Sequence, residues 1–306
     1  MSSHVSLKLQ VFLHLFLVYI SWGTTYLGFS LTLQVMGPFF ACGSRMALGG
    51  LLLCCVFFFT GKWQKVTLRD IGYAAFFGLF LVVAASGFLS YGQQFVSSGT
   101  ASVITGSTPI SMILAGWLFA GEERPNAVQI LGLLGGSCGL VLLAMEQSAL
   151  QPEAATPLFG VFWILAATFG WVAGSLLMRK FPHTSGLPEL QDCGLLLLMG
   201  GLECLALGLL LGEHETSLHF DRLHTGIVLA FTWMVIGGAI IAYSSYFWLL
   251  RHVSITVAVS YEYVVPIIAL SLGAWLLHEE VTRGMILASC LAVGSVFLVL
   301  MHSHNR

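Results

Sequence analysis

The stretch that decides the fold is ASVITGSTPISMILAGWLFAGEE, residues 101–123, because the chain carries a second version of it. The second version is AVSYEYVVPIIALSLGAWLLHEE, residues 258–280. One register superposes the two prolines, Pro109 and Pro266. The same register pairs Ala101 with Ala258, Ile110 with Ile267, Gly116 with Gly273, and Glu122-Glu123 with Glu279-Glu280. A single register that accounts for all these matches indicates an internal repeat.

Both copies belong to a chain that has very few charges. Of its 306 residues, 57% are hydrophobic and only 8% are charged, against about 25% charged residues in a typical soluble protein. Such a chain would expose large apolar patches in water, so its solvent must be lipid. This composition excludes a soluble enzyme, a secreted disulfide scaffold and a nucleic-acid binder. The seven cysteines lie in apolar runs, where we expect them to pack rather than to bind a metal.

A helix needs about 20 apolar residues to cross a bilayer. Charge clusters, prolines and polar loops divide the chain into ten such segments. We predict membrane spans at Val11–Leu33, Pro38–Phe59, Ile71–Gly92, Gly99–Phe119, Val128–Met145, Leu158–Met178, Leu190–Leu211, Thr225–Leu250, Ile255–Leu277 and Gly284–Met301.

The basic residues predict the orientation of these spans, because Lys and Arg are enriched in cytoplasmic loops. With the N-terminus inside, only Arg222 and Arg283 lie in loops on the opposite side. The cytoplasmic segments then hold Lys8, Lys62, Lys65, Arg69, Arg124, Arg179, Lys180, Arg251 and Arg306. We therefore expect a multi-pass protein with both termini in the cytoplasm.

The ten spans fall into two sets of five, in residues 1–150 and 151–306. A slightly smaller offset superposes Cys42-Gly43 on Cys193-Gly194 and Gly49-Gly50 on Gly200-Gly201. Because five is odd, the second set must enter the membrane from the other side, which makes an inverted repeat. The predicted fold is an all-α integral membrane protein of ten transmembrane helices in two inverted five-helix repeats.

Three features resemble a known family: residues 22–26 (Trp-Gly-Thr-Thr-Tyr), Arg45 followed by Met-Ala-Leu, and a Pro-centred fourth span that ends in Gly121-Glu122-Glu123. With ten spans in two halves, the whole chain is similar to the EamA-type permeases of the drug/metabolite transporter superfamily. The resemblance implies a bacterial inner-membrane exporter of amino acids, related metabolites or drugs. Glu262 departs from the pattern of many relatives, so its role is not carried over from the family.

Three charged residues lie deep within predicted spans, where a charge costs at least about 2.5–3.5 kcal/mol. Arg45 either binds a substrate carboxylate or pairs with helix carbonyls. Glu203 and Glu262 are the candidates for proton coupling, and Glu262 is also a candidate for substrate binding. Pro266 removes the backbone hydrogen bond to residue 262. We expect Pro109 and Pro266 to break or hinge their helices.

Aromatic walls with a few polar groups are typical of ligand pockets. Beside Arg45 and Glu262, the predicted substrate-binding residues are Trp22, Tyr26, Tyr91, Gln94, Thr105, Ser107, Trp171 and Tyr261.

These observations predict a secondary active transporter, a probable exporter, that moves small metabolites such as amino acids, aromatic compounds or drugs by alternating access. Uncoupled facilitated diffusion is an open alternative to proton coupling. A membrane-embedded enzyme acting on a lipid-linked substrate is the alternative class. We expect no catalytic residues, cofactor or metal. Because the sequence shows no nucleotide-binding P-loop, we expect an ion gradient or the membrane potential to supply the energy for transport. The expected partners are the small substrate, protons and the lipid bilayer. Glycine pairs at GxxxG spacing fit either a homodimer or packing within the chain.

Overall fold

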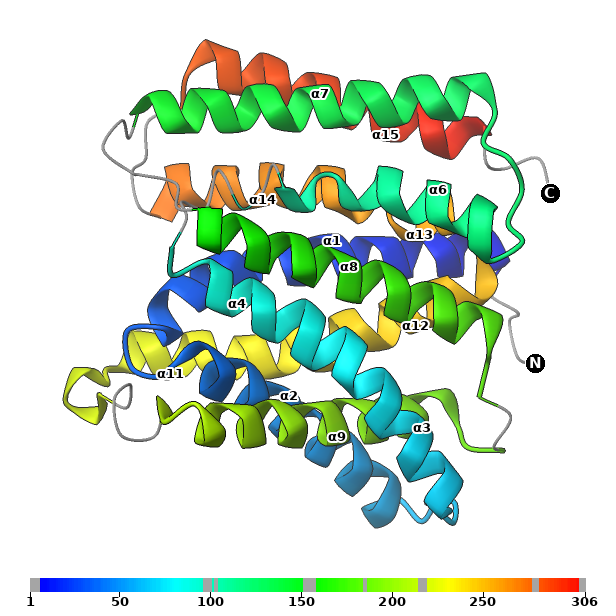
Figure 1. Cartoon of the computed structure of the whole chain (residues 1–306), viewed down its shortest axis with the longest axis vertical. Helices are drawn as coiled ribbons and strands as arrows, with labels where there is room; N and C mark the ends of the chain where they lie inside the picture. Colours follow the sequence, from blue (N-terminus) through cyan, green and yellow to red (C-terminus); the bar gives the residue numbers. More distant parts are fainter. Residues whose placement is uncertain are drawn as a thin grey trace.

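The computed structural model describes residues 6–95, 101, 104–150, 158–183, 186–213, 219–276 and 281–302. Every regular element in these ranges is helical, which confirms the predicted all-α fold (Figure 1). The helices are α1 (Leu7–Thr32), α2 (Pro38–Phe59), α3 (Leu68–Gly78), η1 (Leu79–Gly87), α4 (Phe88–Gly92), α6 (Thr108–Phe119), α7 (Ala127–Leu150), α8 (Leu158–Lys180), α9 (Glu189–Leu210), η2 (Phe220–Arg222), α11 (Thr225–Trp233), η3 (Met234–Ile241), α12 (Ala242–His252), α13 (Ile255–Ala258), α14 (Tyr261–Leu276) and α15 (Arg283–His302).

The described helices are those of an integral membrane protein. Six are long and apolar enough to cross a bilayer, and four further apolar helices are shorter, at 10–17 residues. Most large exposed side chains on them are Leu, Phe, Ile and Val, which suit contact with lipid. The helices run roughly alongside one another (Figure 1). The number of ten crossings stays a prediction.

Helix starts follow local sequence signals. α2 begins at Pro38, where a proline is tolerated because the first N–H groups of a helix have no intrahelical partner. α3 begins after Thr67, whose hydroxyl accepts a hydrogen bond from the Asp70 backbone N–H. The Asp70 carboxylate accepts a bond from the Thr67 N–H at 2.7 Å, which completes a capping box.

The end of α9 is tied to the start of α2. Gly212 adopts a φ of 75°, which favours glycine, and it turns the chain after α9. The following residue, Glu213, is buried and accepts hydrogen bonds from the Phe39 N–H at 3.2 Å and the Phe40 N–H at 2.9 Å. Burial raises the pKa of the Glu213 carboxyl, and these two hydrogen bonds oppose that rise. A carboxylate is favourable here because helix N-termini carry partial positive charge.

The most extensive helix contacts join α2 with α9 and α7 with α15, segments far apart in sequence (Figure 1). Glycines allow the first pair to approach closely. A Cβ at Gly50 would lie 2.3 Å from the Leu198 nitrogen, and one at Gly201 would lie 2.3 Å from the Ala47 nitrogen. The absence of side chains at these two positions therefore sets the distance between α2 and α9.

The GxxxG glycines face neighbouring helices of the same chain. A Cβ at Gly139 would lie 2.8 Å from the Ala288 carbonyl oxygen of α15. Gly170 and Gly174 of α8 lie against η1 in the same way. These glycines support packing within the chain, and the expected homodimer stays a prediction.

Two long helices contain a π-helical segment in their middle. η1 lies between α3 and α4, and η3 lies between α11 and α12. π-Helical turns are rare and occur frequently at functional sites. The residues around η1 and η3 are therefore candidates for a functional site.

Candidate functional site

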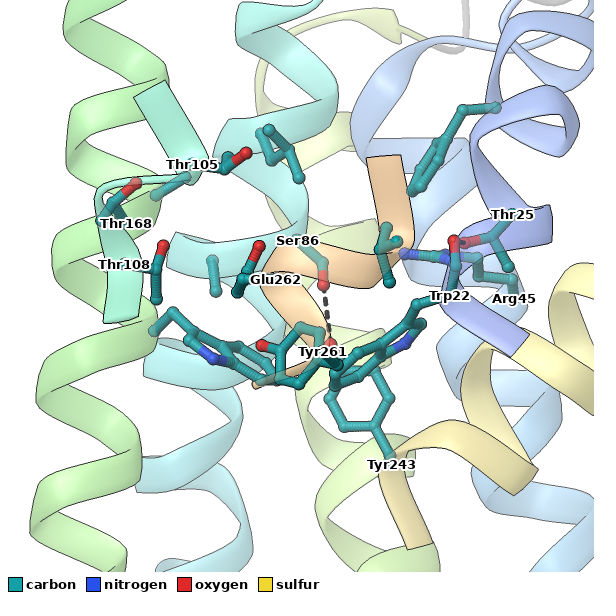
Figure 2. Close-up of a pocket in the computed structure, with 16 residues that line it drawn as sticks. Trp22, Thr25, Arg45, Ser86, Thr105, Thr108, Thr168, Tyr243, Tyr261 and Glu262 are labelled. Carbon is teal, nitrogen blue, oxygen red and sulfur yellow. Dashed lines mark hydrogen bonds between the residues drawn. The ribbon is translucent and has the colours of Figure 1, made fainter. Parts of the chain in front are cut away.

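A cavity of about 110 Å³ lies between α1, α2, η1, α6, α8, α12 and α14 (Figure 2). Its lining combines aromatic rings, hydroxyl groups, a guanidinium and a carboxylate. It brings together six of the residues that the sequence predicts for substrate binding. These are Trp22, Arg45, Thr105, Trp171, Tyr261 and Glu262.

Aromatic rings form a continuous layer along one side of the cavity. The Trp22 ring lies 4.6 Å from that of Tyr261 and 5.4 Å from that of Trp171, measured between centroids. Trp171 lies 4.8 Å from Tyr246, and Tyr243 lies 5.7 Å from Trp22. Most of these pairs meet edge to face, the arrangement that aromatic quadrupoles favour. We call these five residues the aromatic layer.

The aromatic layer is hydrogen-bonded to both π-helical segments. Trp22 of α1 donates its Nε1–H to the Gly238 carbonyl of η3 at 3.2 Å. The Tyr243 hydroxyl donates to the Leu81 carbonyl of η1 at 3.1 Å and also bonds the Ser86 hydroxyl at 2.7 Å. Side chains that line the cavity thus satisfy carbonyls of η1 and η3.

Arg45 of α2 brings a buried positive charge to the cavity. Arg45 is only 3% exposed, and its guanidinium carbon lies 4.4 Å from the centroid of the Phe29 ring. It contacts the thiol of Cys42 on the preceding turn. Its buried Nε has no hydrogen-bond partner, and no carboxylate of the described residues forms an ion pair with it. The guanidinium is therefore available to an anionic ligand.

Glu262 brings a carboxyl group, from the first turn of α14. This group lies close to the side chain of Tyr261, which belongs to the aromatic layer. Figure 2 shows Glu262 and Arg45 apart from each other across the cavity, and they form no ion pair. The cavity thus presents a guanidinium and a carboxyl group to separate parts of a ligand.

Five polar residues of the lining were not predicted as substrate-binding residues. They are Thr25, Ser86, Thr108, Thr168 and Tyr243. Each lies in a long apolar segment in which every helix face is hydrophobic, so no polar stripe indicates which face meets the cavity. The one feature of the sequence that could have indicated Thr108 is its position next to Pro109 in the repeated stretch.

Three predicted substrate-binding residues lie outside the cavity lining. Tyr91 packs against Trp163 with ring centroids 5.3 Å apart. Gln94 is exposed, and its side-chain amide donates to the Tyr91 carbonyl at 3.3 Å. Ser107 donates its hydroxyl to the Ile104 carbonyl at 2.6 Å. The side-chain position of Tyr26 lies outside what the structure describes.

The remaining predicted residues are Glu203 and the two prolines. Glu203 lies on α9 beside Gly78, away from the cavity lining, and its buried Oε2 has no hydrogen-bond partner. Pro109 occupies the first turn of α6, directly after a break in the helix at residues 106–107. Pro266 lies within α14, and the nearest break precedes it at residues 259–260.

Arg179 lies on α8, about 12 Å further along the helix than Trp171. Its hydrogen bonds join several segments at this end of the helix bundle. Arg179 donates to the Glu122 carboxylate at 2.5 Å. It also donates to the Leu250 carbonyl at 2.6 Å and to the Val253 carbonyl at 2.7 Å. One guanidinium thus joins α8, the loop after α6 and the end of α12.

Known proteins resemble the chain along most of its length. The model of the EamA-like transporter family matches twice, at residues 10–145 and 158–301. The uncharacterized inner membrane transporter YedA of Escherichia coli (strain K12) is 28% identical over 96% of this chain and 91% of its own. The uncharacterized transporter YoaV of Bacillus subtilis (strain 168) is 24% identical over 94% of this chain and 96% of its own.

A solved crystal structure has the same fold. It superposes with a TM-score of 0.75 at 17% identity, over 97% of this chain and 99% of its own. Because the family model covers nearly the whole chain in two matches, this membrane protein belongs to the EamA-like transporter family.

Proposed function

We propose that this transporter moves a small zwitterionic metabolite, of the amino-acid kind, out of the cytoplasm across the bacterial inner membrane. One observation carries the proposal: the cavity holds an Arg45 guanidinium and a Glu262 carboxylate that do not pair with each other, beside the aromatic layer. The inner-membrane location agrees with the printed name of the relative YedA.

The charges of a zwitterion would complement those of the cavity. An unpaired charge inside a membrane protein is costly, and such residues commonly mark a substrate pathway. A ligand carboxylate would pair with the Arg45 guanidinium, whose planar donors suit carboxylates. A ligand ammonium would pair with Glu262. The apolar part of the ligand would lie on the aromatic layer, as in other pockets that combine aromatic walls with few polar groups.

We propose alternating access between two inverted five-helix repeats as the mechanism. Its support lies in the pairing of corresponding helices: α2 with α9, and α7 with α15. The π-helical segments η1 and η3 also lie in corresponding positions of the two stretches that match the family model. The hydrogen bonds of Arg179 to Glu122, Leu250 and Val253 would then belong to the state in which the Arg179 end of the bundle is closed.

We further propose that both termini are cytoplasmic, as the positive-inside rule predicts. In that orientation the hydrogen bonds of Arg179 would close the cytoplasmic end of the bundle. The cavity would then open to the non-cytoplasmic side of the membrane. Protons would supply the driving force, with Glu262 ahead of Glu203 as the coupling residue, because only Glu262 lines the cavity.

Counterflow in proteoliposomes tests the substrate class. Purified protein is reconstituted, loaded with one unlabelled solute and offered the labelled form, for a panel of amino acids, nucleobases and cationic drugs. We expect at least one amino acid to exchange faster than in protein-free vesicles, and singly charged cations to exchange poorly. Exchange of cationic drugs without any amino acid would contradict the zwitterion proposal.

The coupling proposal needs its own variant, Glu262→Gln, with Glu203→Gln as the matched control. A proton-coupled transporter runs faster under a pH gradient, and a glutamine cannot carry the proton. We expect Glu262→Gln to abolish the response to the gradient and Glu203→Gln to keep it. If Glu262→Gln responds like the unmodified protein, Glu262 has no part in coupling.

A further inference from the structure

Four threonines line the cavity, and three of them use their hydroxyl within their own helix. Thr25 donates to the Trp22 carbonyl at 2.9 Å, and Thr168 donates to the Ile164 carbonyl at 3.1 Å. Thr105 donates to the carbonyl of residue 101 at 3.0 Å. Such local bonds are common for threonine in helices, and they leave little for a ligand.

The fourth, Thr108, has no such bond. It is the first residue of α6, so the carbonyl one turn earlier is that of Ile104. That carbonyl already accepts the Ser107 hydroxyl at 2.6 Å and the Ser107 N–H at 3.1 Å. Within the described part of the chain, the Thr108 hydroxyl has no hydrogen-bond partner. The residue is only 2% exposed, and it lines the cavity, into which its hydroxyl can point.

The free hydroxyl faces the cavity on the side of Glu262. Figure 2 shows Thr108, Glu262 and Arg45 in this order across the cavity. In the repeat register, Thr108 corresponds to Val265, which also lines the cavity but offers only methyl groups. Of these two corresponding positions, only the one on α6 therefore offers a hydroxyl to the cavity.

We propose that Thr108 is a specificity-determining residue that accepts a hydrogen bond from the ligand's primary ammonium group beside Glu262. This inference rests on the proposed function, since it needs a zwitterionic ligand in the cavity. A primary ammonium has three N–H donors. Glu262 accepts from one of them, and the Thr108 oxygen accepts from another. An N-trimethylated ammonium has the same charge but no N–H, so Thr108 selects against it.

The test compares the twenty common L-amino acids with their N-trimethyl betaines, by the rise each causes in the unfolding temperature of the detergent-solubilised protein. From titrations, we expect Thr108→Val to weaken the binding of the best amino acid about 5- to 20-fold. Betaine binding should change less than about twofold, so the selectivity for the primary ammonium falls.

Two further variants separate this role from a structural one. Thr108→Ser keeps the hydroxyl and should restore the selectivity. Thr32→Val removes a buried hydroxyl that lies outside the cavity lining and donates to the Gly28 carbonyl at 2.9 Å, so the selectivity should stay unchanged. The unliganded Thr108→Val protein should unfold near the normal temperature, because the Thr108 hydroxyl has no protein partner to lose among the described residues.

The outcomes distinguish the two proposals. If no amino acid stabilises the unmodified protein, the zwitterion proposal fails, and this inference fails with it. If amino acids bind but Thr108→Val keeps the full selectivity over the betaines, only the role of Thr108 is overturned.

Discussion

Helices α6 and α14 reach the cavity from different halves of the chain and carry a proline at the same place in the repeat register. They present different chemistry to it. α6 and the turn before it contribute Thr105 and Thr108, whereas α14 contributes Glu262 and Val265 at the corresponding positions. Only one half therefore supplies a charge to this wall of the cavity.

Helices α2 and α9 show the same contrast on another wall. Their contact is reciprocal, since Gly50 of α2 and Gly201 of α9 each lie against backbone of the partner helix. Yet Arg45 of α2 corresponds to Leu196 of α9, which is buried away from the cavity lining. Residues that pack the helices match between the halves, and residues that face the cavity differ. The predictions below separate these two kinds of position.

The largest effect is expected from Gly50→Ala and Gly201→Ala, which add a methyl group where a backbone nitrogen lies 2.3 Å away. Overpacking of this kind costs about 1–3 kcal/mol. We expect both variants to lower the unfolding temperature and the yield of folded protein, by similar amounts.

The matched control for these glycines is Gly72→Ala in α3, because nothing lies within 4 Å of a Cβ at Gly72. An alanine there should be neutral or stabilising, since it favours the helix by up to about 1 kcal/mol. If one of Gly50 and Gly201 tolerates alanine as Gly72 does, the contact is not reciprocal.

The next largest effect is expected from Arg45→Gln, with Leu196→Gln at the corresponding position of α9 as its counterpart. Loss of the guanidinium should weaken amino-acid binding at least about 30-fold, because it leaves a buried ligand carboxylate unpaired. Folding should suffer little, since the Arg45 Nε has no partner to lose.

Leu196→Gln should do the opposite. It places an amide at a site that is 3% exposed, which costs about 1–3 kcal/mol when the amide finds no partner. We expect a lower unfolding temperature with unchanged ligand affinity per folded molecule. Equal effects of the two variants on binding would show that Arg45 has no special role.

A smaller effect is expected from Arg179→Ala, which breaks three contacts at one end of the bundle. The balance between the two states should move toward opening on that side. We expect a cysteine at position 108, in a background without the seven native cysteines, to react about three- to tenfold faster with a maleimide from that side.

Lys180→Ala is the neighbouring control. Among the residues that the structure describes, Lys180 donates only to the Phe119 carbonyl, at 3.1 Å, in an exposed position. Its loss should leave the labelling rate nearly unchanged. Similar rates in both variants would mean that Arg179 does not hold this end closed.

The helices themselves could be predicted because their limits are marked by polar or conformationally restricted residues. The second span was predicted at Pro38–Phe59, where α2 lies, and the sixth at Leu158–Met178 agrees with α8 to within two residues. The fourth was less accurate. It was predicted as one helix from Gly99, whereas α6 begins at Thr108, because the turn at Gly106-Ser107 looks like any other small pair in an apolar run.

The cavity could be predicted in part. Trp22, Arg45 and Glu262 stood out because aromatic or charged side chains are conspicuous in an apolar span. Hydroxyls are not conspicuous, since they bond their own helix at little cost. Ser107 was chosen and Thr108 was missed, although they are neighbours. Which of them is bonded within the helix depends on where α6 begins, and that is set by packing rather than by local sequence.

No pattern in the sequence indicates the π-helical segments, although each of them contacts helices of the other half of the chain. The smallest expected effect concerns η1. Tyr243→Phe removes the hydroxyl that bonds Ser86 and the Leu81 carbonyl of η1. A buried carbonyl would lose its side-chain partner, so we expect a loss of about 1 kcal/mol in unfolding free energy. Ser86→Ala leaves the bond from Tyr243 to Leu81 in place and should cost less. If Ser86→Ala costs as much as Tyr243→Phe, the bond from Tyr243 to the Leu81 carbonyl contributes nothing to stability.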